Sequence, residues 1–233
     1  CDFENQITST NPNEFNKNEG IAIVAIDTEF KLLAYSTGFM YPTSESQYER
    51  SSISGFFAGV IVNNSDELSA VRINRTDFSD NYLGAYINNS LFSIVTRNTF
   101  GVPENDAWIG LEGSASSYGL ALNHSAFYTV EENVFTGDEN TTSINAGLSI
   151  NSSWIWNNEI YRNEFNHLHY GTLIHGLNGG KFSILGYPFS TGLSIKCNDY
   201  GLESPTSDNN TDIYLHTDAV IDDIQGAMDS DQS

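Results

Sequence analysis

The sequence is poor in several kinds of residue, and each shortage excludes a class of protein. Lysine and arginine number 9 against 30 aspartates and glutamates, which gives 233 residues a formal charge of −21. Because phosphate contacts require clustered cationic side chains, this balance excludes a general nucleic-acid-binding protein. The longest aliphatic run is Ile21–Ile26. A membrane-spanning helix needs roughly 20 apolar residues, so we expect no transmembrane segment.

Only two cysteines occur, Cys1 and Cys197, so the core must supply the stability that a disulfide framework gives other proteins. A chain that begins with cysteine has two interpretations: a lipid-carrying lipoprotein cysteine, or a piece of a longer protein. The repeat described below favours the second. Low lysine content, abundant asparagine and strong acidity favour a secreted or bacterial cell-surface protein.

Residues typical of strands and turns dominate what is present. Asparagine occurs 26 times and glycine 19 times, whereas the residues that favour surface helices are scarce. The apolar content of 39% and aromatic content of 12% are too high for a disordered acidic tail. The composition therefore predicts a folded, all-β domain.

Two short motifs repeat along the chain. The first motif is a glycine followed by an apolar residue, any residue and a second apolar residue. Its degenerate last copy begins at Asp212. Its glycines are Gly20, Gly59, Gly84, Gly119, Gly147, Gly171 and Gly192. The second motif ends in asparagine, any residue and an aromatic residue. Its copies are Asn98–Phe100, Asn133–Phe135, Asn163–Phe165 and Asn198–Tyr200, with weaker versions at Thr76–Phe78, Thr28–Phe30 and Cys1–Phe3.

One such repeat cannot bury its apolar face alone, so we expect the repeats to stack as coils with a continuous core. Glycine would open strands where another backbone comes close. Inward rings would form a column of Phe78, Phe100, Phe135, Phe165 and Tyr200. At one corner a hydrogen-bonded ladder would contain Asn98, Asn133, Asn163 and Asn198.

This pattern resembles right-handed parallel β-helix proteins of the pectin-lyase-like type, in particular Asn-rich secreted or surface proteins of Bacteroidota. The resemblance implies an all-β solenoid of about eight coils over residues 1–225, as a segment of a longer protein. Loop insertions are expected at 31–58, 101–118 and 137–145. Residues 226–233 would form an acidic tail or linker. Other chains or domains would cap the open solenoid ends.

Enzymes with this fold cleave acidic polysaccharides, and the resemblance implies carboxylates with an arginine or lysine base. Arg97, Glu132 and Arg162 each precede a ladder asparagine and would stack on one face. They are the weak catalytic candidates. We favour a charge ladder that stabilises the register over a catalytic or uronate-binding strip. Fragments of the polygalacturonase motifs occur, but His175–Gly176 precedes Asn210–Asp212, which is the wrong order.

Metal and sugar contacts have weaker signals. His167 and His169, with His175, lack a third ligand at suitable spacing, so we expect turn histidines and no metal site. We expect no cofactor; calcium is the one candidate, at the acidic turns 104–106, 137–139 and 208–210. Exposed tryptophans could stack on sugars. Alternation places Trp154 and Trp156 on one side, for which we favour the core; the third tryptophan is Trp108.

The sequence therefore predicts a non-catalytic secreted or cell-surface scaffold, adhesin-like or glycan-contacting, whose partner is a polysaccharide or another cell-surface molecule. One alternative is a polysaccharide lyase or glycoside hydrolase that acts on an acidic glycan. Another is a cargo or component of a bacterial secretion or motility machine.

Overall fold

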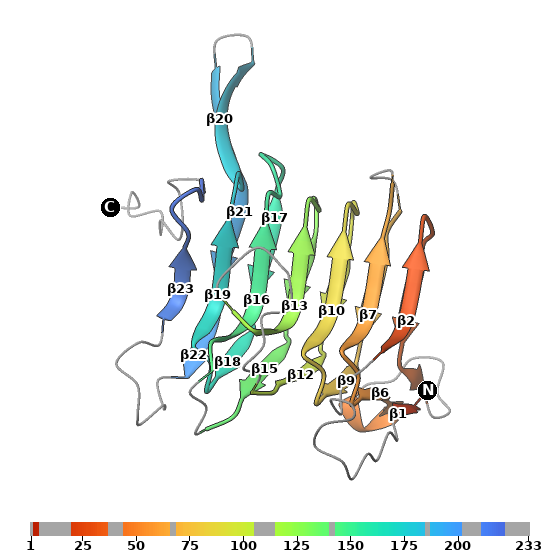
Figure 1. The fold of residues 1–233 in the computed structure, drawn as a ribbon. Helices are drawn as coiled ribbons and strands as arrows, with labels where there is room; N and C mark the ends of the chain where they lie inside the picture. The colour runs from red at the N-terminus through yellow and green to blue at the C-terminus, as the bar shows by residue number, and fades with distance from the viewer. Residues whose placement is uncertain are drawn as a thin grey trace.

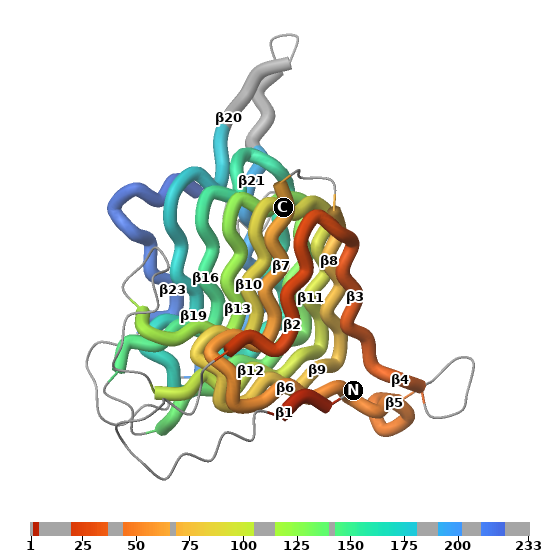
Figure 2. The backbone as a smooth tube through the Cα atoms, turned by 45° about the vertical axis from the view of Figure 1, so that its right-hand side comes forward, coloured from red at the N-terminus to blue at the C-terminus, as the bar shows by residue number. Residues whose placement is uncertain are grey.

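A computed structural model describes residues 2–4, 20–36, 44–65, 69–104, 115–139, 143–184, 187–201 and 211–221, and of 181–190 the backbone alone. The chain winds into a parallel β-helix whose coils each place one strand in each of three sheets (Figures 1 and 2). Cys1, Trp108 and the predicted boundary after residue 225 lie outside the described residues.

Each sheet contains seven strands. Sheet I consists of β2 (Ile21–Ile26), β7 (Ala58–Asn63), β10 (Leu83–Asn88), β13 (Ser117–Asn123), β16 (Asn145–Asn151), β19 (Tyr170–His175) and β23 (Thr211–Leu215). Sheet II consists of β3 (Phe30–Leu33), β8 (Val71–Asn74), β11 (Ile94–Thr96), β14 (Thr129–Glu131), β17 (Asn158–Tyr161), β21 (Tyr187–Lys196) and β20 (Gly179–Ile184). Sheet III consists of β1 (Asp2–Glu4), β6 (Ser51–Ser54), β9 (Thr76–Ser79), β12 (Thr99–Val102), β15 (Val134–Gly137), β18 (Glu164–Asn166) and β22 (Asp199–Gly201).

Strands of adjacent coils pair in parallel, as in β10 with β13 and β13 with β16. In the described residues six coils contribute to all three sheets, and β1 and β23 belong to partial coils at opposite ends. The predicted insertion at 31–58 contains an antiparallel hairpin of β4 (Tyr35–Ser36) and β5 (Tyr48–Glu49), with the 3-10 turn η1 (Glu45–Gln47) before β5. A second hairpin, β20–β21, projects beyond the coils (Figure 1).

The inward faces of the strands form one elongated core, because alternate residues of each strand point inside. Aromatic rings fill it next to sheet III. Neighbouring rings have centroids 4.7–4.9 Å apart and planes inclined by 4–8°. The coil spacing sets this separation, which suits offset stacking. The column consists of the five predicted residues, Phe78, Phe100, Phe135, Phe165 and Tyr200.

Glycines of sheet I make room for this column. A Cβ atom on Gly119 would lie 2.7 Å from the carbonyl oxygen of Gly147 and 2.7 Å from Cδ1 of Phe135. Real Cβ atoms do not approach so closely, so a side chain here would push the backbone and the ring apart. The same close approach occurs at Gly59, Gly84, Gly119, Gly147 and Gly171.

Three predicted copies of the motifs do not occupy the same place in the coil as the other copies. Gly192 belongs to sheet II, where Leu193 pairs with Asn158. In β2 it is Ala22, not Gly20, that lies opposite Gly59, because Ile21 pairs with Ala58. The segment Thr28–Phe30 leads into β3 of sheet II, outside the asparagine and aromatic columns. Apolar alternation after a glycine fits an inward-facing strand in any sheet, which explains these misassignments.

Part of the outer face of sheet I is also buried, which the repeat did not predict, although Val24 of β2 is 52% exposed. On this face the side chains of Tyr118, Ala146 and Leu173 are fully buried, each with 0% exposure. Ala115 and Ile144, from the segments that precede β13 and β16, pack against this face as part of a second apolar cluster. The middle strands of sheet I therefore lie between two apolar clusters.

Candidate functional site

The corner between sheets II and III carries the predicted asparagine ladder. Nδ2 of Asn98 donates to Oδ1 of Asn133 at 2.9 Å, and Nδ2 of Asn133 donates to Oδ1 of Asn163 at 2.9 Å. Nδ2 of Asn163 donates to Oδ1 of Asn198 at 3.0 Å. The structure therefore brings all four predicted asparagines together. Thr76 occupies the same place one coil earlier, and its N–H donates to Oδ1 of Asn98 at 2.9 Å.

Each ladder amide also bonds the backbone at the corner. Oδ1 of Asn133 accepts the backbone N–H of Asn98 at 3.0 Å, and Nδ2 of Asn133 donates to the carbonyl oxygen of Val95 at 2.9 Å. All donors and acceptors of this buried amide are satisfied. The residue just before each ladder position has a positive φ, of 53–58°, at Arg75, Arg97, Glu132, Arg162 and Cys197. This left-handed conformation is unfavourable for most side chains, so the ladder holds a strained corner.

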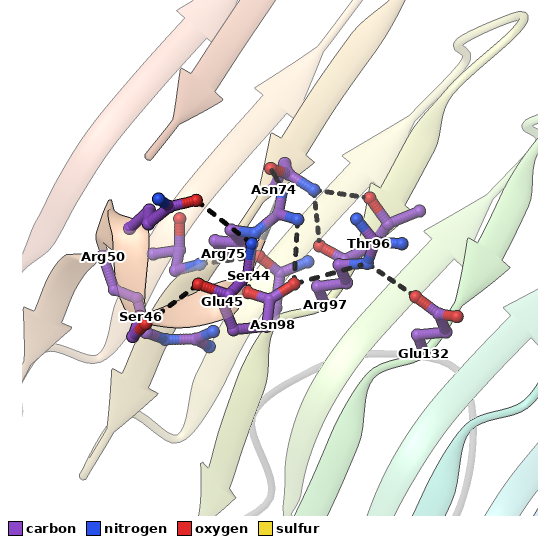
Figure 3. A network of polar contacts seen from close by, with 12 residues as sticks. Ser44, Glu45, Ser46, Arg50, Asn74, Arg75, Thr96, Arg97, Asn98 and Glu132 are labelled. Atoms are coloured by element: carbon purple, nitrogen blue, oxygen red, sulfur yellow. Dashed lines mark hydrogen bonds and ion pairs between the residues drawn. The ribbon is translucent and has the colours of Figure 1, made fainter. Parts of the chain in front are cut away.

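The corner residues Arg97 and Glu132 place charged groups at the surface, whereas the side chain of Arg75 is 8% exposed, and Figure 3 shows how the three connect. Nε of Arg97 lies 2.6 Å from Oε2 of Glu132 and 3.8 Å from Oε1 of Glu45. Nε of Arg75 lies 2.8 Å from Oε2 of Glu45, and its guanidinium covers the Tyr48 ring at 3.8 Å. The hairpin insertion thus supplies Glu45 and Tyr48 to a network that alternates in charge.

Arg162, the third candidate of the predicted strip, makes a different contact. It occupies the equivalent corner position, with φ of 54°, beside Glu132 of the preceding coil. Its guanidinium lies 4.7 Å from the centroid of the Tyr161 ring. Arg97, Glu132 and Arg162 occupy equivalent positions in successive coils, because Thr96 pairs with Glu131 and Glu131 with Tyr161. The sequence analysis did not identify Glu45 and Arg75, which the insertion and a preceding coil bring close to Arg97.

The electrostatics of this network favour the charged forms of Glu45 and Arg97. The hydrogen bond from Arg75 holds the pKa of Glu45 below its usual value. The hydrogen bond to Glu132 raises the pKa of Arg97. A carboxyl group that serves as a general acid usually has a raised pKa. An arginine that serves as a general base must have a lowered pKa, so that it can give up its proton. Both shifts instead stabilise the charged forms, as expected of structural ion pairs.

Replacing Glu45 by glutamine should lower the free energy of unfolding by about 1 kcal/mol or less at neutral pH, because water screens this largely exposed carboxylate. The folded state has the lowered pKa. The contribution is therefore complete above the usual pKa of glutamate and disappears as the pH falls through the lowered value. Urea unfolding at several pH values should show a gap between wild type and variant that closes in acid. A gap independent of pH would contradict this, and Glu139→Gln, at an exposed turn, is the control.

The corner between sheets I and II carries a second aromatic column, on the outside. The Phe92 and Phe127 rings have centroids 5.1 Å apart and planes inclined by 15°. The Phe127 and Trp156 rings follow at 5.0 Å and 31°. Phe92 is 57% exposed and Trp156 is 46% exposed, with Trp154 beside it at 52%. Phe92 and Trp156 are exposed and Phe127 between them is half-buried, so three consecutive coils form an apolar strip at the surface, a feature found at interaction surfaces.

The structure overturns the core position favoured for Trp154 and Trp156. Both follow β16, where the chain turns the corner, and φ of Trp154 is 60°, so strand alternation does not apply to them. The sequence analysis also missed Phe92 and Phe127. Each lies four residues after the asparagine that ends its sheet I strand, Asn88 or Asn123, and that shared offset is the signal that could have revealed the column.

The predicted histidine group is not one site. His167 and His169 precede β19, whereas His175 is its last residue. About 3.3 Å per residue separates the two ends of a strand. Of the calcium candidates, turns 104–106 and 137–139 approach each other, since the N–H of Glu104 donates to Oδ2 of Asp138 at 3.2 Å. Asn105, Asp106 and the turn at 208–210 lie outside the described residues.

The fold and the corner columns define the protein as a parallel β-helix with a polar ladder on one corner and exposed rings on another. No protein-family model matches the sequence, and comparisons with curated proteins and with solved structures return no match. Within the part of the chain that the structure describes, we find no helix with the length and apolar character needed to cross a membrane.

Proposed function

We propose that the protein is a non-catalytic β-helix scaffold of the cell exterior that contacts glycans through the exposed aromatic column. The observation that carries the proposal is the strip of Phe92, Phe127 and Trp156 along three coils. The inner columns already stabilise the coils, so the exposed rings need another reason to be there. A pyranose ring presents CH groups on one face, and that apolar face can pack along the outward edges of the stacked rings.

The spacing of the column suits an extended glycan chain. Ring centroids repeat at 5.1 and 5.0 Å along the coil axis. Because each ring covers the face of its neighbour, successive sugars of a linear polymer would lie across the outward edges of successive rings. The charge of −21 opposes polyanions, and we therefore assign a neutral polysaccharide as the ligand. The ion-paired state of Arg97 and Glu132 supports a scaffold over a lyase.

Removing the Trp156 ring should weaken binding to a neutral polysaccharide several-fold to roughly tenfold, because one stacked ring contributes about 0.5–1.5 kcal/mol. Affinity electrophoresis through gels containing soluble neutral glucans, mannans or xylans measures this for wild type, Trp156→Ala and Phe92→Ala. Since Trp154 and Trp156 are exposed, binding should also change the tryptophan fluorescence. Tyr35→Ala is the control, because Tyr35 is 72% exposed on the β4–β5 hairpin, away from the column.

Two results would contradict the proposal. One is equal retardation of wild type, Trp156→Ala and Phe92→Ala in every glucan, mannan and xylan gel. The other is turnover of a uronate polymer, detected as reducing ends or unsaturated product, that Arg162→Ala abolishes. That second outcome would favour the polysaccharide lyase or glycoside hydrolase instead.

A further inference from the structure

The outer column at the end of the sheet I strands changes residue type in the last coils. Asn63, Asn88 and Asn123 are linked through their side chains, since Nδ2 of Asn88 donates to Asn63 at 2.7 Å and Nδ2 of Asn123 donates to Asn88 at 2.8 Å. Asn151 pairs with Asn123 in the next coil. The following residue of the column is His175, which pairs with Asn151. At this position histidine therefore takes the place of the asparagine that earlier coils have in the same column.

The next residue of this column is a histidine as well. Ile174 pairs with Leu215, and the N–H of His216 donates to the carbonyl oxygen of Ile174 at 3.0 Å. His216 therefore stacks on His175, with ring centroids 4.5 Å apart and planes inclined by 37°. Two imidazoles separated by 41 positions in the sequence (216 − 175) are held together by the parallel pairing of β19 and β23.

A carboxylate completes the group. Oδ1 of Asp218 lies 2.7 Å from Nδ1 of His216 and 3.9 Å from Nδ1 of His175. One ligand atom from each of the three residues lies within 4.8 Å of the others. The segment that carries Asp218 is anchored, because the N–H of Ala219 donates to the carbonyl oxygen of His216 and the N–H of Val220 to that of Gly176, each at 2.8 Å.

We infer that His175, His216 and Asp218 form a binding site for a divalent transition-metal ion of the zinc class. Two imidazole nitrogens and one carboxylate oxygen are the ligands that zinc takes in sites with an open position. Calcium, which takes six to eight oxygen ligands, fits this set poorly. Three protein ligands leave a fourth position for water or for a group of a bound molecule.

The side chains divide into a fixed ligand and two adjustable ones. His175 is 4% exposed and is held in the wall of the solenoid, whereas His216 is 42% and Asp218 59% exposed. Ligand atoms about 2.0–2.2 Å from a tetrahedral zinc ion lie roughly 3.4 Å from each other. When zinc binds, the 2.7 Å distance from Oδ1 of Asp218 to Nδ1 of His216 must lengthen slightly. The 3.9 Å distance from Oδ1 of Asp218 to Nδ1 of His175 must shorten slightly. Both shifts are small for exposed side chains.

A bound ion would also join elements of the fold. His175 ends β19, and His216 and Asp218 follow β23, the last strand of sheet I. Binding to the folded state alone stabilises it by linkage. Zinc should therefore raise the unfolding temperature of the chain and slow the amide exchange of β23 relative to the metal-free protein.

The test uses the full chain after removal of metals with a chelator. Titration calorimetry with zinc chloride and the visible absorption of added cobalt(II) should each show one ion per chain. His216→Asn restores the residue type of the ladder and should lower the zinc affinity at least about tenfold, as should Asp218→Asn. His124→Asn is the matched control, because His124 is an exposed corner histidine in another coil, and it should bind as wild type does.

Three results would overturn the inference. They are the absence of saturable zinc binding, equal affinity in wild type and His216→Asn, and an equal loss in His124→Asn. If Asp218→Asn keeps the wild-type affinity while His216→Asn loses it, the three-ligand assignment is wrong.

Discussion

Replacing Asn133 by alanine should lower the free energy of unfolding by about 4 kcal/mol, a large part of the ~5–15 kcal/mol available to a domain. The substitution removes an amide that is 0% exposed. The backbone N–H and Nδ2 of Asn98 lose their acceptor, and the carbonyl oxygen of Val95 loses a donor. A buried polar group left without a partner costs about 1–3 kcal/mol.

Urea unfolding followed by circular dichroism measures the effect. The matched control is Asn166→Ala, since Asn166 is partly exposed and its Nδ2 donates to the exposed carboxylate of Glu164 at 2.7 Å. That substitution should change stability by about 0.5 kcal/mol or less. A loss at Asn133 as small as the loss at Asn166 would show that the amides do not form a buried ladder.

Replacing Phe135 by alanine should destabilise the protein by about 3–5 kcal/mol. The ring is 0% exposed and stacks on Phe100 and Phe165, each at 4.9 Å. Its removal leaves a cavity between two rings that the coil spacing holds apart, so the neighbours cannot collapse into it. Phe135→Leu keeps most of the apolar volume and should cost less than alanine.

The exposed column supplies the control for this substitution. Phe92→Ala removes the same ring from a 57% exposed position and should change the unfolding free energy by about 1 kcal/mol or less. The two variants should therefore separate the two columns, since Phe135→Ala affects stability and Phe92→Ala affects glycan binding. Equal destabilisation by both would contradict the assignment of Phe135 to the core.

The columns were predictable because one physical requirement recurs in every coil. A corner amide must bond the coils on both sides, and a ring must fill the same interior position, so Asn133 and Phe135 repeat in Asn163 and Phe165 with the same spacing. The register of parallel strands follows once these pairs are matched. Asp212 lies opposite Gly171 in the same register, at the place of the degenerate last copy of the glycine motif.

Positions that depend on the path between the repeats were not predictable. Gly192 lies within β21, the second strand of the β20–β21 hairpin, opposite Gly179, and its motif therefore belongs to sheet II. Glu45 reaches Arg75 only because the insertion folds back over the corner. His216 carries no local sign of pairing with His175, and only the alignment of the last two sheet I strands brings them together. Such contacts depend on loop conformations, which short motifs do not encode.

In-register stacking of parallel coils is the central claim, and disulfide formation between chosen cysteines tests it most directly. Ile94 of β11 and Thr129 of β14 are Cα partners, whereas Glu131 lies two residues further along β14 on the same face. Partner Cα atoms lie about 4.8 Å apart, within the range a disulfide can join, but the diagonal pair at roughly 8 Å exceeds it.

With Cys1 and Cys197 replaced by serine, Ile94→Cys/Thr129→Cys should oxidise to an intramolecular disulfide, detected by intact mass and thiol titration. Ile94→Cys/Glu131→Cys should retain its free thiols under the same conditions. Preferential oxidation of the Ile94→Cys/Glu131→Cys pair, or failure of both pairs to oxidise, would contradict the stacked register from which every column described here follows.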